Sequence, residues 1–213
     1  MSKSGRSTKG VSDLSSKILK MLLVIVALVC GIVGIVVGTY EGVETAKRVK
    51  YPIAYGDYIL QYAGENDLDP FLVMAVIHIE SNFVPEAQSH IAYGLMQMTE
   101  ETAEWTAKDM KMKGDYDITE PETSIKFGCH YLKHLINVYG NVDTALAAYN
   151  AGMGNVDKWL KDPNYSSDGK TLYKIPFPET RSYVKRVNES WEYYKATDFS
   201  DLNDEQGKLL KKI

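Results

Sequence analysis

The pattern of apolar positions predicts helices along most of this chain. Residues 70–80 read PFLVMAVIHIE, with valine or isoleucine seven, four and three residues before Glu80. On a helix these offsets share one face, so the Glu80 carboxyl points in the same direction as the side chains that form a core. Apolar surroundings disfavour the charged form of a carboxyl group and raise its pKa. Glu80 is therefore a candidate general acid near neutral pH.

Similar patterns predict the other elements of a mainly helical, all-α domain. Thr99 is a predicted N-cap, and Thr119-Glu120-Pro121-Glu122 reads as a capping box. No run of alternating apolar and polar positions predicts a long strand. Turn signals occupy residues 164–178, with one or two short extended pieces. Helices are expected near residues 55–62, 70–80, 100–110, 121–139, 143–150, 155–160 and 180–194.

The N-terminal part has a different composition. Residues 1–20 are polar with five cationic side chains, whereas residues 21–39 are apolar and uncharged, just long enough to cross a bilayer as a helix. A cleaved signal peptide would need a shorter apolar core and a small-residue cleavage site. A lipoprotein signal would need small residues before Cys30, where Val29 stands. We therefore expect a retained transmembrane helix with the basic N-terminus in the cytoplasm.

This interpretation predicts a single-pass protein of the cell membrane with an extracytoplasmic domain. The net charge of −4 gives no reason to expect nucleic acid as a partner. Cys30 and Cys129 would lie in different surroundings and are not expected to pair, so the outer domain depends on its core. The expected parts are a basic N-terminus (1–20), a transmembrane anchor (21–39), a linker (40–52), the outer domain (53–197) and a charged tail (198–213).

Four short motifs follow one another along the outer domain. They are ESNF at residues 80–83, GLMQM at 94–98, AAYNAG at 147–152 and ETRSYV at 179–184. Together they closely resemble the catalytic domain of SLT-type lytic transglycosylases, in glycoside hydrolase family twenty-three. The resemblance extends over about residues 55–194. Each motif alone is weak, but four in this order at compatible spacing are a specific signal.

The resemblance implies a lysozyme-like, mainly helical fold. It also implies cleavage of the β-1,4 bond between MurNAc and GlcNAc in peptidoglycan, with a 1,6-anhydro-MurNAc end as product and Glu80 as the single general acid and base. The expected partners are peptidoglycan glycan strands and the cytoplasmic membrane, and no cofactor or metal is expected. The resemblance also marks five residues for substrate binding. Ser81 is expected to supply a hydroxyl beside Glu80. Met96 and Gln97 are expected to line the cleft, and Tyr149 and Asn150 to form its opposite wall.

The residues themselves leave two alternatives open. Ordinary glycosidases use two carboxylates, whereas the motif region offers one at an apolar position. A muramidase that hydrolyses the same bond would need a second carboxylate, for which Asp117 and Glu179 are candidates. The other alternative is a non-catalytic wall-binding scaffold of an envelope machine, and the presence of Glu80 together with Tyr149 and Asn150 argues against it.

Three features depart from the family pattern. The segment between Ser89 and Gly94 is one residue shorter than usual, which leaves the geometry of this loop open. Glu100 stands where the family often has proline, and Ser124 stands where asparagine is common. We expect neither Glu100 nor Ser124 to touch the chemistry. Among the marked residues, Met96 is also typical of a core position.

Overall fold

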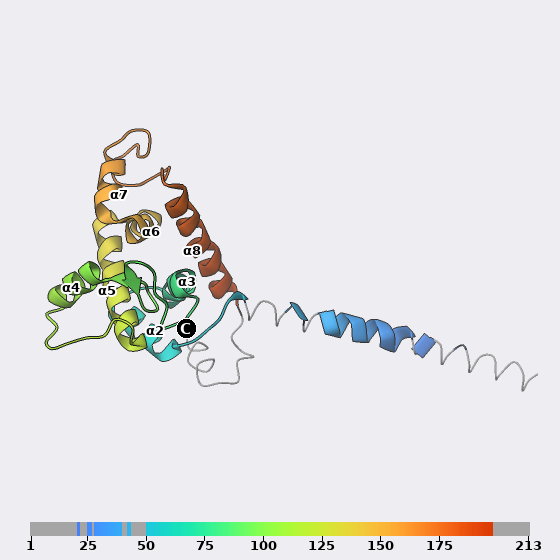
Figure 1. The fold of residues 1–213 in the computed structure, drawn as a ribbon. Helices are drawn as coiled ribbons and strands as arrows, with labels where there is room; N and C mark the ends of the chain where they lie inside the picture. The colour runs from blue at the N-terminus through green and yellow to red at the C-terminus, as the bar shows by residue number, and fades with distance from the viewer. Residues whose placement is uncertain (1–20, 22–24, 27, 40–41, 44–49, 198–213) are drawn as a thin grey trace, which may run out of the picture. The chain divides into compact units, whose positions relative to one another are not determined.

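The chain divides into two compact units, Met1–Lys50 and Tyr51–Ile213, and each is described by itself. The expected basic N-terminus (1–20) and charged tail (198–213) lie outside the described residues. The computed structural model describes residues 21, 25–26, 28–39, 42–43 and 50–197 (Figure 1).

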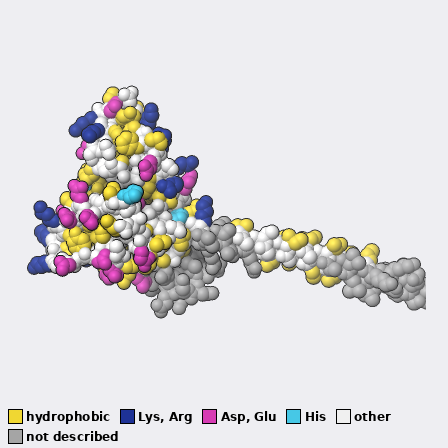
Figure 2. Space-filling view, viewed as in Figure 1, with side chains coloured by type: hydrophobic (Ala, Val, Ile, Leu, Met, Phe, Trp, Pro, Cys, Tyr) yellow, Lys and Arg dark blue, Asp and Glu magenta, His cyan; other side chains and the backbone are white. Residues whose placement is uncertain are grey.

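In the first unit, the expected transmembrane segment 21–39 is described only in part, because residues 22–24 and 27 lie outside the described residues. Residues 28–39 are helical, and apolar side chains such as Ile32 and Ile35 are exposed. Figure 2 shows hydrophobic side chains at the surface along this segment. Among the residues that the structure describes, no helix is both long and apolar enough to span a membrane.

The described part of the second unit is mainly helical, which confirms the predicted class of this domain. Its strands are β1 (Ala92–Tyr93) and β2 (Met98–Thr99). Its helices are α2 (Gly56–Glu65), α3 (Pro70–Ser81), α4 (Glu100–Asp109), α5 (Pro121–Tyr139), α6 (Val142–Ala151), α7 (Met153–Leu160) and α8 (Pro178–Ala196).

Helix α3 is enclosed by the rest of the unit. The Asp69 carboxylate accepts a hydrogen bond from the Phe71 N–H at 2.8 Å, and Pro70 occupies the first turn, so the helix begins where a cap and a proline favour it. All residues from 72 to 77 are buried. Helices α8 and α2 both pack against α3 (Figure 1). A helix that is apolar on all sides is buried on all sides, and Glu80 lies in its last turn.

Helix α8 lies along α3 with Val184 and Val187 buried, as their spacing predicts. Its C-terminal half is fastened to the start of the domain by two hydrogen bonds. The Trp191 indole N–H donates to the Asp69 carboxylate at 2.7 Å, and the Tyr194 hydroxyl donates to the Pro52 carbonyl at 2.8 Å. This attachment holds the N-terminal half of α8 beside the end of α3, where Glu80 lies.

The predicted capping box at the start of α5 is wrong. The N-cap is Glu120, with no hydrogen bond from its side chain, and Pro121 follows it. The Thr119 hydroxyl donates to Asp117 instead, at 2.6 Å. The Glu122 carboxylate, which a capping box would turn back to the backbone, accepts a hydrogen bond from the Tyr62 hydroxyl at 2.6 Å. A tertiary contact with α2 therefore replaces the local one.

Two further differences concern extended structure. Strands β1 and β2 pair antiparallel, Ala92 with Thr99 and Tyr93 with Met98, and this hairpin was not predicted. Strands of two residues carry too little alternation to be recognised in a sequence. The short extended pieces expected within 164–178 do not form strands in the described chain. Turns occupy that region, and the Asp168 carboxylate accepts hydrogen bonds from the Lys170 and Thr171 N–H groups, both at 2.8 Å.

Candidate functional site

The site is built around the end of α3. Glu80 lies one residue before the last helical residue and is partly buried. The chain then leaves the helix through two residues with left-handed backbone, Asn82 at φ 52° and Phe83 at φ 62°. Such conformations are costly for residues other than glycine and gather at functional sites. They end the helix directly after Glu80 and Ser81.

The Glu80 carboxyl is held by a residue from the other end of the domain. The Tyr183 hydroxyl, on α8, donates a hydrogen bond to its Oε1 atom at 2.7 Å. Burial raises the pKa of Glu80 to about 7, although this hydrogen bond and the positive charge of Arg186 both pull the pKa down. The carboxyl is therefore poised to exchange a proton near neutral pH, as its apolar helix face predicted.

The expected contact of Ser81 with Glu80 or substrate is replaced here by contacts with backbone. The Ser81 hydroxyl lies 2.7 Å from the Leu95 carbonyl and 3.1 Å from the Ile77 carbonyl, and it shares its proton between these acceptors. The residue is buried. Ser81 thus fastens the loop 94–98 to the last turn of α3, directly beside Glu80.

Met96, expected in the cleft lining, has no exposed surface. Its side chain packs against Gly128 of α5, where an added Cβ would lie 2.2 Å from the Met96 sulfur. Its N–H donates to the Ser124 hydroxyl at 3.1 Å. This buried serine on α5 positions the backbone of the loop 94–98, here called the cleft loop. That Ser124 does not touch the chemistry stays a prediction. An asparagine at this position would likewise offer an acceptor to that N–H.

The shortened loop before Gly94 is held by two hydrogen bonds to one carbonyl group, that of Ala87. The Ala87 carbonyl accepts hydrogen bonds from the Gly94 N–H at 2.9 Å and from the Gln97 side-chain amide at 2.9 Å. The same amide nitrogen donates to the Gly94 carbonyl at 3.0 Å. Gly94 has φ 78°, and an added Cβ would lie 2.2 Å from the Ile118 carbonyl oxygen, so only glycine fits there.

Tyr149 lies within electrostatic reach of Glu80. The negative charge of Glu80 adds to burial in raising the pKa of Tyr149 well above its usual value. The Tyr149 hydroxyl donates to the Met96 carbonyl at 2.7 Å, so the end of α6 is tied to the cleft loop. A cavity of about 290 Å³ opens here and is lined by Gln97, Tyr149 and Asn150 among others. Glu80, Ser81 and Met96 are not among the residues that line it.

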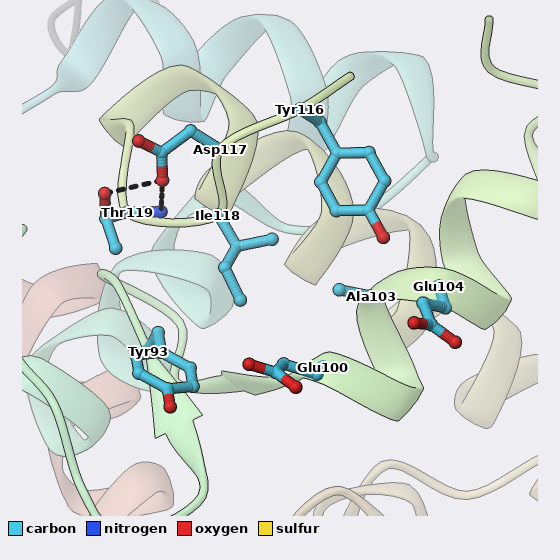
Figure 3. Close-up of a pocket in the computed structure, with 8 residues that line it drawn as sticks. All are labelled: Tyr93, Glu100, Ala103, Glu104, Tyr116, Asp117, Ile118 and Thr119. Carbon is cyan, nitrogen blue, oxygen red and sulfur yellow. Dashed lines mark hydrogen bonds between the residues drawn. The ribbon is translucent and has the colours of Figure 1, made fainter. Parts of the chain in front are cut away.

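A second cavity, of about 480 Å³, lies between α4 and the loop before α5, with Tyr93 of β1 also in its lining (Figure 3). None of the predicted site residues lines it. In Figure 3 the Asp117 carboxylate faces Thr119, whose N–H and hydroxyl donate to it at 2.8 and 2.6 Å. These hydrogen bonds lower the pKa of Asp117. Its carboxylate therefore stays charged, and Asp117 is not a proton donor like Glu80. Within the described residues, no group of three or more His, Cys, Asp and Glu side chains is placed to hold a metal ion.

Comparison with known proteins identifies the family. The model of the transglycosylase SLT domain matches residues 57–172, more than half of the chain. The chain belongs to this family. The SLT domain is 37% identical over 152 residues to the soluble lytic murein transglycosylase of Salmonella typhimurium, covering 68% of this chain and 24% of that protein. It is 28% identical over 169 residues to the membrane-bound lytic murein transglycosylase C of Cronobacter sakazakii, covering 66% and 46%.

The fold comparison agrees. The SLT domain superposes on the 70 kDa soluble lytic transglycosylase from Escherichia coli with a TM-score of 0.60 and 32% identity, covering 68% of this chain and 25% of the other. The arrangement of its helices is therefore the lysozyme-like one of that family, as the motifs implied. The chain spans about a quarter of the length of the soluble relatives that it matches.

Two site residues of this SLT domain were missed in the sequence. Tyr183 stands inside the fourth motif, four residues before the buried Val187, so both side chains lie on the same face of the helix. This spacing could have indicated that the Tyr183 ring is buried and that its hydroxyl needs a hydrogen-bond partner. Arg186 is exposed and carries no such mark. Nothing local connects either residue with Glu80, which precedes Tyr183 by 103 residues.

Proposed function

We propose that this chain is a membrane-anchored lytic transglycosylase. It would cleave the β-1,4 bond between MurNAc and GlcNAc of peptidoglycan and leave a 1,6-anhydro-MurNAc end. The observation that carries this proposal is the Glu80 carboxyl, partly buried, with a pKa of about 7 and an oxygen held by Tyr183 at 2.7 Å. A group with this pKa is present in both protonation states near neutral pH, which a residue acting first as acid and then as base requires.

In the proposed reaction, Glu80 donates its proton to the glycosidic oxygen as the bond to C1 breaks. The carboxylate that results takes the proton from the C6 hydroxyl of MurNAc, whose oxygen attacks C1 and closes the anhydro ring. The proton count balances, because Glu80 ends protonated as it began. The Tyr183 hydroxyl and the Arg186 charge stabilise the intermediate carboxylate. Gln97 and Asn150 border the cavity of about 290 Å³ and would bind the sugars, and the Tyr149 ring would form its wall.

The two carboxylates that would serve a hydrolase are less suited than Glu80. Asp117 is exposed, its pKa is lowered, and it lines the other cavity. Glu179 is exposed in the first turn of α8, four residues before Tyr183, so its side chain lies on the same face as Tyr183. Glu179 therefore stays the residue through which a muramidase would act, and the product decides between the two reactions.

Mass spectrometry of digested peptidoglycan tests the proposed reaction. Lytic cleavage gives muramyl ends that are lighter by one water than the hydrolysed ends, so the wild type should release anhydro products. Glu179→Gln should release the same products at a similar rate. Hydrolysed ends from the wild type, lost in Glu179→Gln, would establish a muramidase. A zymogram without any lysis by the purified protein would favour a wall-binding scaffold.

The pH dependence of turnover should change when the Tyr183 hydroxyl is removed. The free enzyme needs protonated Glu80, so kcat/KM should fall as the pH rises above about 7. The Tyr183 hydrogen bond lowers the pKa of Glu80, so Tyr183→Phe should move this alkaline limb to higher pH. Tyr194→Phe is the matched control, because it removes a hydroxyl from the same helix that bonds Pro52 instead. A limb that stays in place, or moves to lower pH, would contradict the assigned roles.

The proposed anchor makes a separate prediction. Deletion of residues 1–39 should release the protein from the membrane fraction and leave lysis intact, because every catalytic motif follows residue 53. A protease added to intact spheroplasts should digest the domain 53–197 of the full chain, since that domain is expected outside the cytoplasmic membrane. Membrane association of the deletion variant would refute the anchor, and protection of the domain would reverse the topology.

A further inference from the structure

A row of aromatic rings leads from the candidate site to the surface over α4 and α5. Tyr149, at the site, lies with its ring centroid 5.6 Å from that of Tyr131, and Tyr131 lies 5.8 Å from Trp105 in an edge-to-face arrangement. Trp105 in turn lies 4.5 Å from His134. The row is therefore continuous from Tyr149 and Tyr131, in the lining of the cavity, to Trp105 and His134.

The outer residues of this row, Trp105 and His134, lie one helical turn beyond residues that line the cavity, on α4 and α5. Thr102 and Tyr131 line the cavity of about 290 Å³. Trp105 follows Thr102 by three residues on α4, and His134 follows Tyr131 by three residues on α5, so each lies one turn further along the same helix face. The surface formed by Trp105, Tyr131 and His134, here called the aromatic ridge, therefore continues the lining of the cavity.

The exposure of Trp105 sets it apart from the other two tryptophans of the chain. Trp159 is 7% exposed, and the Trp191 indole N–H donates to Asp69. Trp105 is 36% exposed, and its indole N–H has no hydrogen-bond partner among the described residues. The Tyr131 ring contacts the indole edge-to-face and the His134 ring is tilted by 55° against it, and these contacts hold the indole while Trp105 stays 36% exposed. The ring thus presents an apolar surface and a free N–H to solvent in one preorganised position.

Sugar rings match this combination of groups. A pyranose presents a face of C–H groups, which packs on an aromatic ring, and a rim of hydroxyl and acetamido groups, which accept and donate hydrogen bonds. The edge of the ridge is polar, because the His130 Nε2 and Asp109 Oδ2 atoms lie 2.7 Å apart beside it. A polar edge next to an aromatic ring suits the hydroxyl-rich rim of a sugar.

We propose that the aromatic ridge is a distal sugar-binding subsite, which holds the glycan strand beyond the sugars next to the bond that breaks. This inference rests on the proposed action on glycan strands. It adds that binding depends on strand length: a short fragment occupies the cavity alone, whereas a longer strand also stacks on Trp105. The ridge then favours long strands over the short fragments that cleavage releases.

Calorimetric binding of peptide-free glycan strands tests this inference. The full chain carries Glu80→Gln, so that the strands are not cleaved, and a disaccharide is compared with strands of several repeats. Trp105→Ala should bind the long strands about tenfold more weakly, a loss of about 1.4 kcal/mol, and the disaccharide almost unchanged. Trp105→Phe, which keeps a smaller ring, should fall between Trp105→Ala and the Glu80→Gln parent.

Tyr173→Ala is the matched control, since Tyr173 is a 62% exposed aromatic residue in the loop between α7 and α8. It should leave binding at every length unchanged. Equal weakening of short and long strands by Trp105→Ala, or no weakening of either, would overturn the subsite. So would a parent protein whose affinity does not rise with length. Product analysis with the wild type reports on the proposed reaction independently, so a failure of that reaction is seen apart from a failure of the subsite.

Discussion

Glu80→Gln is expected to abolish lysis while the fold stays intact. The amide keeps the shape of the carboxyl and its oxygen can still accept the hydrogen bond from Tyr183, but it has no acidic proton to transfer to the leaving group. General acid and base terms contribute roughly 10²–10⁴-fold each, and Glu80 would supply both. Turbidity loss of a peptidoglycan suspension measures the effect. More than about a tenth of wild-type activity, with unchanged circular dichroism, would refute the assignment.

The same substitution should raise stability at alkaline pH. The Glu80 pKa is raised from 4.5 to about 7, so the folded state binds this proton more tightly than the unfolded chain does. Below about 4.5 both states are protonated and the free energy of unfolding is unaffected. As the pH rises through this window, only the unfolded state loses its proton, and folding becomes less favourable by roughly 1–3 kcal/mol above pH 7.

Glutamine has no such titration, so Glu80→Gln should unfold at higher urea concentration than the wild type at pH 8 and at a similar concentration at pH 4. Glu86→Gln is the matched control, because Glu86 is an exposed carboxylate a few residues further along the chain. It should show no pH-dependent gain. A Glu80→Gln variant that is less stable than the wild type at pH 8 would mean that the folded state favours the charged carboxylate.

Tyr149→Ala is expected to reduce both stability and turnover. The ring packs against the core and carries the hydrogen bond to the Met96 carbonyl at 2.7 Å, so its removal should cost roughly 3–5 kcal/mol. Tyr149→Phe keeps the ring and leaves the buried Met96 carbonyl without this donor, a loss of roughly 1–3 kcal/mol. Urea unfolding measures both values, and turnover is assayed where each variant is folded.

The structure changes the interpretation of this pair of variants. A hydroxyl aimed at the reacting sugar would make Tyr149→Phe slow and as stable as the wild type. Because the hydroxyl bonds the cleft loop instead, Tyr149→Phe should lose stability, and its turnover should fall only as far as the loop 94–98 moves. A Tyr149→Phe variant with wild-type stability and strongly reduced turnover would favour a direct role toward substrate.

Much of the domain follows from local patterns in the sequence. The apolar run before Glu80 predicted both the helix α3 and the raised pKa, because an α-helix brings residues three, four and seven positions apart onto one face. The cap Thr99 acted where it was predicted, since its side chain accepts a hydrogen bond from the Thr102 N–H, only three residues away. Helix periodicity and local caps are short-range properties, which a single sequence contains wherever no tertiary contact competes with them.

The partners of the site residues were decided only by the tertiary structure. Tyr183 donates to Glu80 because α8 packs along α3. The Ser124 hydroxyl, on α5, accepts a hydrogen bond from the Met96 N–H, and the Ser81 hydroxyl donates to the Leu95 carbonyl. The capping box failed for the same reason, because Glu122 found Tyr62 of α2. A buried polar group forms a hydrogen bond with whichever partner the packing brings within reach, because a buried group without a partner lowers the stability of the fold. That partner is chosen by the packing of elements distant in the chain, which local sequence does not contain.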